Sequence, residues 1–310
     1  MLKDIVSIGL PVDETFRIRK NSITQGEGKR ICVVTGIHGD ELEGQYVCFR
    51  LGQIINENPE YLHGTVDIYP AMNPLGVDSI TRGIPGFDLD MNRTFPGSQT
   101  GDMIEFVGTK IMEDMQGADL VLDIHASNIY LTEVPQIRIN ELHADKLVPI
   151  AKKSNIDFIW VHGASTVLES TFAHSLNSRD IPCLVVEMGV GMRLTSEYGE
   201  QLTMGILNLM KEMDMWDGPV DPVREPIVSS DPNEVEFLNA PCSGMFMKTK
   251  NHGTWVKKGE SVGYIFDPYT SEVLEYVNAS KSGLLFTIRE YPLVDEGSLM
   301  GRILVQEERA

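Results

Sequence analysis

Two histidines and one glutamate of this 310-residue chain have the side chains and spacing of a metal site. His38 and Glu41 lie three residues apart, where an apolar segment ends and a helical pattern begins, so both can point to one side and share an ion. With seven histidines and 45 acidic residues in the chain, about one such pair also arises by chance. His125 ends a second apolar segment, where a lone histidine is compatible with an ordinary core residue, but Asp123 would project to the same face and orient its ring. Two histidines and a glutamate with a fourth position open predict a catalytic zinc site.

A carboxylate ends a third apolar segment. Glu187 follows the run 182–186, and a charge at this position is costly to bury unless something pairs with it or uses it. The alternative is a glutamate that simply reaches the surface at the end of a strand. If the three segments are parallel strands, His38, His125 and Glu187 meet at the carboxyl edge of the sheet, where open α/β sheets bind ligands. The joint pattern, more than any one of its members, indicates an active site.

An asparagine and an arginine stand together in a long segment of weak periodicity, residues 73–101. Loops of this length in a compact domain are usually functional. Arg93 can form a bidentate ion pair with a carboxylate, and Asn92 can add a hydrogen-bond donor. Arg82 supplies a further cation in the same segment. The alternative is a surface pair without function, but beside a metal motif these residues are predicted to bind substrate.

Strands and helices alternate through the first two thirds of the chain. Apolar, β-branched runs predict strands, and apolar residues at helical spacing predict helices. The predicted strands are 30–37, 65–69, 118–124, 158–161 and 183–186, and the predicted helices are 40–56, 102–115, 142–153, 167–178 and 196–213. This alternation predicts an α/β fold whose mixed, mainly parallel sheet carries helices on both faces.

The pattern changes after about residue 215. The segment 216–226 contains three prolines, as expected of a linker. From 235 to 305, short apolar stretches alternate with Gly, Pro, Asn and Asp, which predicts an all-β module. We therefore divide the chain into an α/β domain, residues 1–220, and a C-terminal β domain, residues 221–310.

In order and spacing, four of these motifs resemble the succinylglutamate desuccinylase/aspartoacylase branch of the zinc carboxypeptidases. They are Gly-Ile-His-Gly-Asp-Glu at 36–41, Asp-Leu-Asp-Met-Asn-Arg-Thr-Phe-Pro-Gly at 88–97, Asp-Ile-His at 123–125 and Glu-Met-Gly at 187–189. The resemblance covers about residues 30 to 215 and then the tail. It implies a zinc carboxypeptidase-like fold with one Zn²⁺ per subunit.

The resemblance also assigns roles to the candidate residues. It implies that His38, Glu41 and His125 are the zinc ligands and that Glu187 is the general base. Asn92 and Arg93 would grip a substrate carboxylate, and Arg82 would match the arginine that stabilises the oxyanion.

The tail resembles the C-terminal β domain of the same family and, more broadly, the barrel-sandwich of lipoyl and biotinyl domains. A carrier domain needs a lysine at the tip of its hairpin, and the corresponding segment, 267–273, has none. We therefore expect a structural module that caps the active site or mediates contacts between copies in a homo-oligomer. Tyr264 or Tyr269 could reach the cavity, and the sequence does not choose between them.

Composition limits the partners. The formal net charge of −19 argues against nucleic acid and anionic membranes. The chain has no apolar run long enough to span a bilayer and no secretory signal at its start, and its four cysteines form no Cys-x-x-Cys pair, so we expect a cytoplasmic location. The expected partner is a small molecule that carries a carboxylate.

The predicted reaction is zinc-dependent hydrolysis of the amide bond of an N-acyl amino acid or a similar small amide. Water activated by the metal would attack the carbonyl, with a glutamate as the general base. A peptide-cleaving zinc carboxypeptidase is the nearest alternative. A non-catalytic anion-binding protein of the same fold is the alternative from another class.

Overall fold

The computed structural model describes residues 1–87, 89–163 and 170–306. Asp88 of the Asp-Leu-Asp-Met-Asn-Arg motif and the first part of the helix predicted at 167–178 lie outside these ranges. Within them the helices are α1 (Glu43–Glu57), α2 (Pro74–Ser79), α3 (Met103–Asp114), α4 (Ala144–Ala151), α5 (Phe172–Asn177) and α6 (Ser196–Glu212), with short 3-10 turns at Pro59–Tyr61, Met91–Arg93, Glu141–His143 and Pro232–Glu234.

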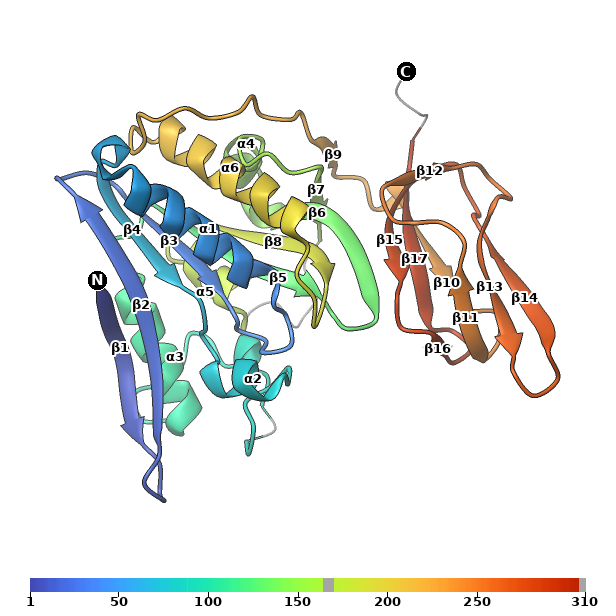
Figure 1. Ribbon diagram of the computed structural model, residues 1–310, viewed down its shortest axis with the longest axis horizontal. Helices are drawn as coiled ribbons and strands as arrows, with labels where there is room; N and C mark the ends of the chain where they lie inside the picture. The colour runs from blue at the N-terminus through green and yellow to red at the C-terminus, as the bar shows by residue number, and fades with distance from the viewer. Residues whose placement is uncertain (88, 164–169, 307–310) are drawn as a thin grey trace.

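One large mixed sheet runs through the molecule (Figure 1). Its strands, in spatial order, are β1 (Leu2–Gly9), β2 (Thr15–Gln25), β4 (Gly64–Tyr69), β3 (Arg30–Thr35), β5 (Leu120–Ser127), β8 (Cys183–Val190), β6 (Leu131–Asn140), β15 (Gly283–Arg289), β17 (Leu299–Val305) and β10 (Val235–Asn239). Off this path, β7 (Phe158–His162) pairs with β6 and with β9 (Ile227–Ser229), and β12 (Thr254–Val256) pairs with β15.

The centre of the sheet is parallel, as the alternating pattern predicts. Strand β3 pairs in parallel with β4 and with β5, and β5 pairs in parallel with β8. The register places His125 of β5 directly opposite Glu187 of β8. The carboxyl ends of these strands therefore lie at one edge, where their polar residues face a common space.

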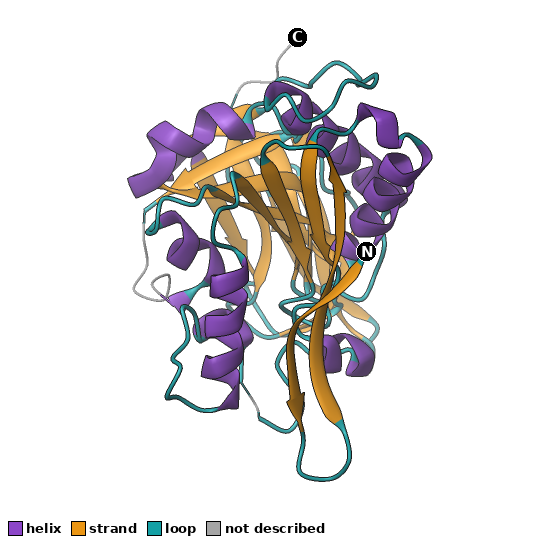
Figure 2. Cartoon of the chain, turned by 90° about the vertical axis from the view of Figure 1, so that its left-hand side faces the viewer, coloured by secondary structure: helices purple, strands orange, loops and turns teal. Residues whose placement is uncertain are grey.

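Helices cover both faces of this sheet, which confirms the predicted fold class (Figure 2). Apolar residues of α1, α4 and α6 pack with Ile31, Val33 and Leu122 on one face. Residues of α3 and α5 pack with the other face, beside the hairpin β1–β2. Burial of these apolar side chains is the main force that holds the layers together.

Two parts of the sheet are absent from the sequence prediction. The hairpin β1–β2 has Lys20 on its buried face, where the ammonium pairs with Asp67 at 3.0 Å and with Asp114 at 2.8 Å, so a buried charge interrupts the alternation of apolar residues. Strand β6 is almost wholly buried yet contains Glu133 and Gln136. Lys20 and Glu133 find charged partners inside the protein, but in the sequence they interrupt the apolar pattern that would predict a strand.

The C-terminal segment is all-β, and it continues the large sheet instead of only docking on it. Strand β15 pairs antiparallel with β6, and β17 and β10 extend the sheet from there. A second sheet faces these strands and consists of β14 (Glu272–Asn278), β13 (Ser261–Asp267), β11 (Gly244–Lys248) and β16 (Leu293–Val294). Val262, Ile265 and Ile303 lie in the core between the two sheets. None of the helices in the described ranges has the length and apolar character needed to cross a membrane.

Candidate active site

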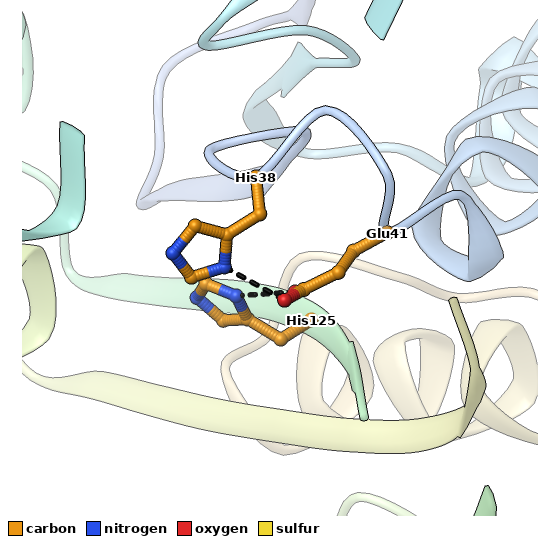
Figure 3. Close-up of side chains that lie close together, drawn as sticks. All are labelled: His38, Glu41 and His125. Atoms are coloured by element: carbon orange, nitrogen blue, oxygen red, sulfur yellow. Dashed lines mark hydrogen bonds and ion pairs between the residues drawn. The ribbon is translucent and has the colours of Figure 1, made fainter. Parts of the chain in front are cut away.

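The three residues predicted to bind a metal come together at the carboxyl edge of the sheet (Figure 3). Nδ1 of His38 lies 2.8 Å from Oε1 of Glu41, and Nδ1 of His125 lies 2.8 Å from Oε2 of the same carboxylate. One candidate ligand atom from each residue lies within 4.8 Å of the others. All three side chains are buried.

A tight loop between β3 and α1 sets the position of His38 and Glu41. Gly39 lies against α2 so closely that a Cβ atom on it would be 1.9 Å from the backbone carbonyl carbon of Gly76. Only glycine fits this approach. The helix begins at Glu43, later than the sequence pattern indicates, so Glu41 belongs to the loop and faces His125 on the neighbouring strand.

Each imidazole has a second carboxylate behind it. Nε2 of His125 lies 3.1 Å from Oδ2 of Asp123, on the same strand face as the alternation predicts. Nε2 of His38 lies 3.0 Å from Oδ1 of Asp90, a residue of the quoted motif to which sequence reasoning gave no role. Both rings are thereby held with Nδ1 toward Glu41. This donor set is compatible with a metal site.

The electrostatics of the cluster favour a cation. Burial by itself lowers the pKa of His125, but Asp123 and Glu41 overcome this effect and raise it well above its ordinary value. Burial raises the pKa of Glu41, but His125 and His38 more than offset this and lower it far below its ordinary range. The buried carboxylate of Glu41 therefore stays ionised and favours positive charge at the histidine nitrogens, whether that charge comes from protons or from a metal ion.

Glu187 lines the same cavity as these residues. Burial raises the pKa of its carboxyl to about 7, and Arg138, whose Nη1 lies 3.3 Å from Oε1 of Glu187, opposes that rise. A carboxyl with a pKa near neutrality can accept and release a proton at the pH of the cell. The structure thus brings Glu187 and the histidine cluster together, as the converging strands predict.

The segment 73–101 supplies the opposite wall, and it contains α2 and a 3-10 turn instead of being wholly irregular. Oδ1 of Asn92 accepts a hydrogen bond of 2.8 Å from the backbone N–H of Phe172, so the amide is oriented. Arg93 donates to the backbone oxygen of Asn92 at 2.8 Å, and no carboxylate of the described residues pairs with it. Both side chains line the cavity, where a ligand carboxylate could meet them.

Arg82 also lines the cavity, but its terminal nitrogens already have partners. Nη1 donates to Oε1 of Glu41 and Nη2 donates to Oδ2 of Asp90, each at 3.1 Å. In this structure Arg82 therefore holds the carboxylates of Glu41 and Asp90 in place beside His38.

Sequence reasoning missed the inner wall of the cavity. Arg138 of β6 and Arg302 of β17 both line it, and the buried Glu133 lies between them. The signal available in the sequence was the charged residues within the apolar runs 131–139 and 299–305. The C-terminal module thus reaches the site through an arginine. Tyr269 is 97% exposed and Tyr264 lines a separate groove, so neither tyrosine enters this cavity.

Comparison with known proteins agrees with this geometry. Residues 27–213, more than half of the chain, match the family model described as succinylglutamate desuccinylase/aspartoacylase catalytic domain. The chain belongs to this family, and it is an amide-hydrolysing enzyme of the deacylase type. The match favours an enzyme over the non-catalytic binding protein of the same fold.

Individual relatives cover most of the chain. It is 25% identical over 285 residues to the N-alpha-acetyl-L-2,4-diaminobutyric acid deacetylase of Halomonas elongata, covering 87% of this chain and 80% of that one. Its fold is similar to that of the ectoine utilization protein EutE (DoeB) from Ruegeria pomeroyi, with a TM-score of 0.79, 20% identity and coverage of 94% and 90% of the two chains. A metallo-carboxypeptidase from Burkholderia cenocepacia is more distant, with a TM-score of 0.54, 12% identity and coverage of 68% and 63%.

Proposed function

We propose that this enzyme is a zinc-dependent deacylase that hydrolyses the amide bond of a small N-acyl amino acid. The observation that carries the proposal is the convergence of His38, Glu41 and His125 in one cavity with Glu187. These three side chains would hold the ion, and the donor set of two imidazoles and one carboxylate with an open position suits catalytic zinc. When bound, zinc would lower the pKa of water and withdraw electron density from an amide carbonyl.

The chain's own residues would handle the protons. Glu187, as a carboxylate, accepts a proton from the attacking water and then donates it to the nitrogen of the leaving amine. Its pKa of about 7 lets both transfers occur near neutral pH. Arg82 is the proposed partner of the developing oxyanion. Since Glu41 and Asp90 hold both of its terminal nitrogens, this role requires one of those contacts to shift when substrate binds.

Asn92 and Arg93 are proposed to fix the substrate through its carboxylate. Arg93 has no carboxylate partner among the described residues, and Nδ2 of Asn92 makes no hydrogen bond within them, so both retain donors for a ligand. A carboxylate held here would set the register of the amide relative to the metal cluster and Glu187.

The size of the cavity favours a small substrate over a peptide. Its volume is about 340 Å³, at the small end of the usual range for ligand sites. Arg302 of the C-terminal strands forms part of its wall. The name of the Halomonas elongata relative, an acetyl-amino-acid deacetylase, also supports a small N-acyl substrate. A screen of formyl, acetyl and succinyl amino acids and of short peptides with the zinc-loaded enzyme tests the proposal, and hydrolysis of peptides alone would refute it.

Replacing Arg93 with alanine is expected to lower kcat/KM by about 10- to 100-fold, because a hydrogen-bonded ion pair with the substrate carboxylate is lost. Most of the effect should appear as a higher KM. Steady-state kinetics on the best N-acyl amino acid check this, and Arg93→Lys should recover part of the loss. Arg179→Ala, in the turn after α5, is the matched control, because Arg179 lines a separate pocket. An Arg93→Ala enzyme with unchanged kinetics would contradict the role in binding.

Replacing Arg138 with glutamine is expected to move the acidic limb of the kcat/KM profile to higher pH by about one pH unit. Burial raises the pKa of Glu187 and Arg138 opposes the rise, so without the guanidinium Glu187 takes up its proton at a higher pH. The carboxylate form needed as the base is then lost sooner on acidification. Rates measured from about pH 5 to 9 check this, with the charge-retaining Arg138→Lys as control. An acidic limb at unchanged pH would show that this limb does not reflect the protonation of Glu187.

A further inference from the structure

Four arginines line the cavity, and among the described residues no lysine does. They are Arg82, Arg93, Arg138 and Arg302. How many substrate carboxylates the site can accept depends on how many of these guanidinium groups are still without a protein carboxylate. The contacts of each side chain answer this question.

Three of the four are already paired. Arg82 holds Glu41 and Asp90. Arg138 donates through Nη2 to Oε2 of Glu133 at 2.7 Å, and its Nη1 faces Glu187 at 3.3 Å.

Glu133 also pairs with the third of these arginines, Arg302, on the C-terminal strand β17. Nη1 of Arg302 lies 2.5 Å from Oε1 of Glu133, which also accepts a hydrogen bond of 3.0 Å from Thr287. Glu133 itself is fully buried. The two guanidinium groups that it joins lie over the ring of Trp160, 5.8 and 5.7 Å from the ring centre. One buried carboxylate thus holds a pair of arginines that come from different parts of the sheet, and together with Glu187 it offsets their two positive charges.

Arg93 is the remaining cation. It pairs with no carboxylate in the described part of the chain, and the sequence between Gly163 and Ser170, which is outside that part, contains no lysine or arginine. Burial lowers the pKa values of His143 and His162, so these two cavity histidines add no fixed charge at neutral pH. A second substrate carboxylate would lose its hydration beside Glu187 and Asp123 without a free cation to meet it.

We propose that the site takes substrates with a single carboxylate, and that Glu133 is the residue that sets this limit, because with Glu187 it offsets the charges of Arg138 and Arg302. This inference rests on the proposed deacylase function and narrows it. The acyl group is then uncharged, as in formyl or acetyl, and not the half-amide of a dicarboxylic acid. The amino acid released likewise carries no acidic side chain.

Isosteric pairs of substrates separate charge from size. The zinc-loaded wild-type enzyme is assayed at about pH 8, where unperturbed histidines are neutral, on N-acetylglutamine against N-acetylglutamate and on N-succinamoyl against N-succinyl alanine. Within each pair the neutral member should have a kcat/KM at least about 10-fold higher, mainly through KM. Equal values, or a preference for the charged member, would overturn the inference while leaving the deacylase function intact. If no N-acyl amino acid of the panel or of the wider screen is hydrolysed, the proposed function fails and the inference fails with it.

Two variants test Glu133 in opposite directions. Glu133→Gln removes one of the two carboxylates that offset the charges of the arginine pair, so the ratio of kcat/KM for the charged over the neutral substrate should rise by about 10-fold. Arg302→Gln removes one cation, so the same ratio should fall further. If Glu133 had a merely structural role, kcat/KM for both substrates would fall together and their ratio would stay unchanged. Glu260→Gln, which breaks a surface ion pair with Lys250, is the matched control.

The ratio is meaningful only for folded enzyme, so melting temperature and zinc content accompany each variant. Should Glu133→Gln not fold, the Arg302→Gln ratio together with the wild-type substrate pairs still decides the question. Ratios that equal the wild-type value in the variants that fold would overturn the assignment of Glu133.

Discussion

Replacing Glu187 with glutamine is expected to lower kcat by about 100- to 10,000-fold while the metal content stays the same. The amide has nearly the shape of the carboxylate, but it cannot accept the proton of the attacking water. Glu187 lies opposite His125 in the strand register and is not one of the three clustered ligands, so its loss should leave their donor set whole. Steady-state kinetics and elemental analysis of the same preparation measure both quantities.

The control for this variant removes a carboxylate that also pairs with an arginine but lies outside the cavity. Glu200 on α6 pairs with Arg50 at 2.6 Å, and Glu200→Gln should keep its activity. A Glu187→Gln protein without metal would make Glu187 a ligand, and one with full activity would leave the reaction without its proposed base. Either result would require a different mechanism.

Replacing His125 with alanine is expected to abolish stoichiometric zinc binding and, with it, turnover. The substitution removes one of the three proposed ligands and leaves Glu41 and Asp123 as buried carboxylates without the imidazole between them. An ion that binds only the folded protein stabilises it by about 4 kcal/mol when present at 1,000 times its Kd. Loss of the site should therefore also remove the rise in melting temperature, about 5–10 °C, that zinc gives the wild-type protein.

Chelation and reconstitution provide the companion experiment. The wild-type enzyme should lose activity with a chelator and regain it with zinc, whereas the His125→Ala protein should respond to neither. His63→Ala is the matched control, because His63 pairs with Asp217 at the surface. Stoichiometric zinc in purified His125→Ala, or wild-type activity that survives complete removal of metal, would refute the proposed site.

Much of the site follows from local sequence patterns. Strands β3, β5 and β8 are largely apolar, and each has a histidine or a glutamate at or just beyond its carboxyl end. Parallel strands place their carboxyl ends at one edge of the sheet. His38, His125 and Glu187 are therefore expected at the same edge once the three segments are taken as parallel strands. The period of a strand also places Asp123 on the same face as His125, where the structure has it.

Other parts of the fold could not be predicted in this way. Strands β2 and β6 have charged residues on buried faces, and hydrophobic pattern alone counts such residues as exposed. Lys20 and Glu133 are buried because each meets opposite charges from distant segments. Such partners become visible only when the sheet order is known, since burial of a charge depends on what pairs with it.

The sequence by itself determined the α/β class and predicted the candidate metal ligands and base, since these depend on residue type, spacing and period. Only the tertiary structure decided which carboxylate lies behind each histidine and which cavity arginine has no carboxylate partner among the described residues. Arg302 and Glu133 are 169 residues apart and meet because β17 and β6 both flank β15. Pairings of this kind depend on strand order and register, which local patterns do not record, and they are the reason that Arg93 is proposed as the cation for the substrate.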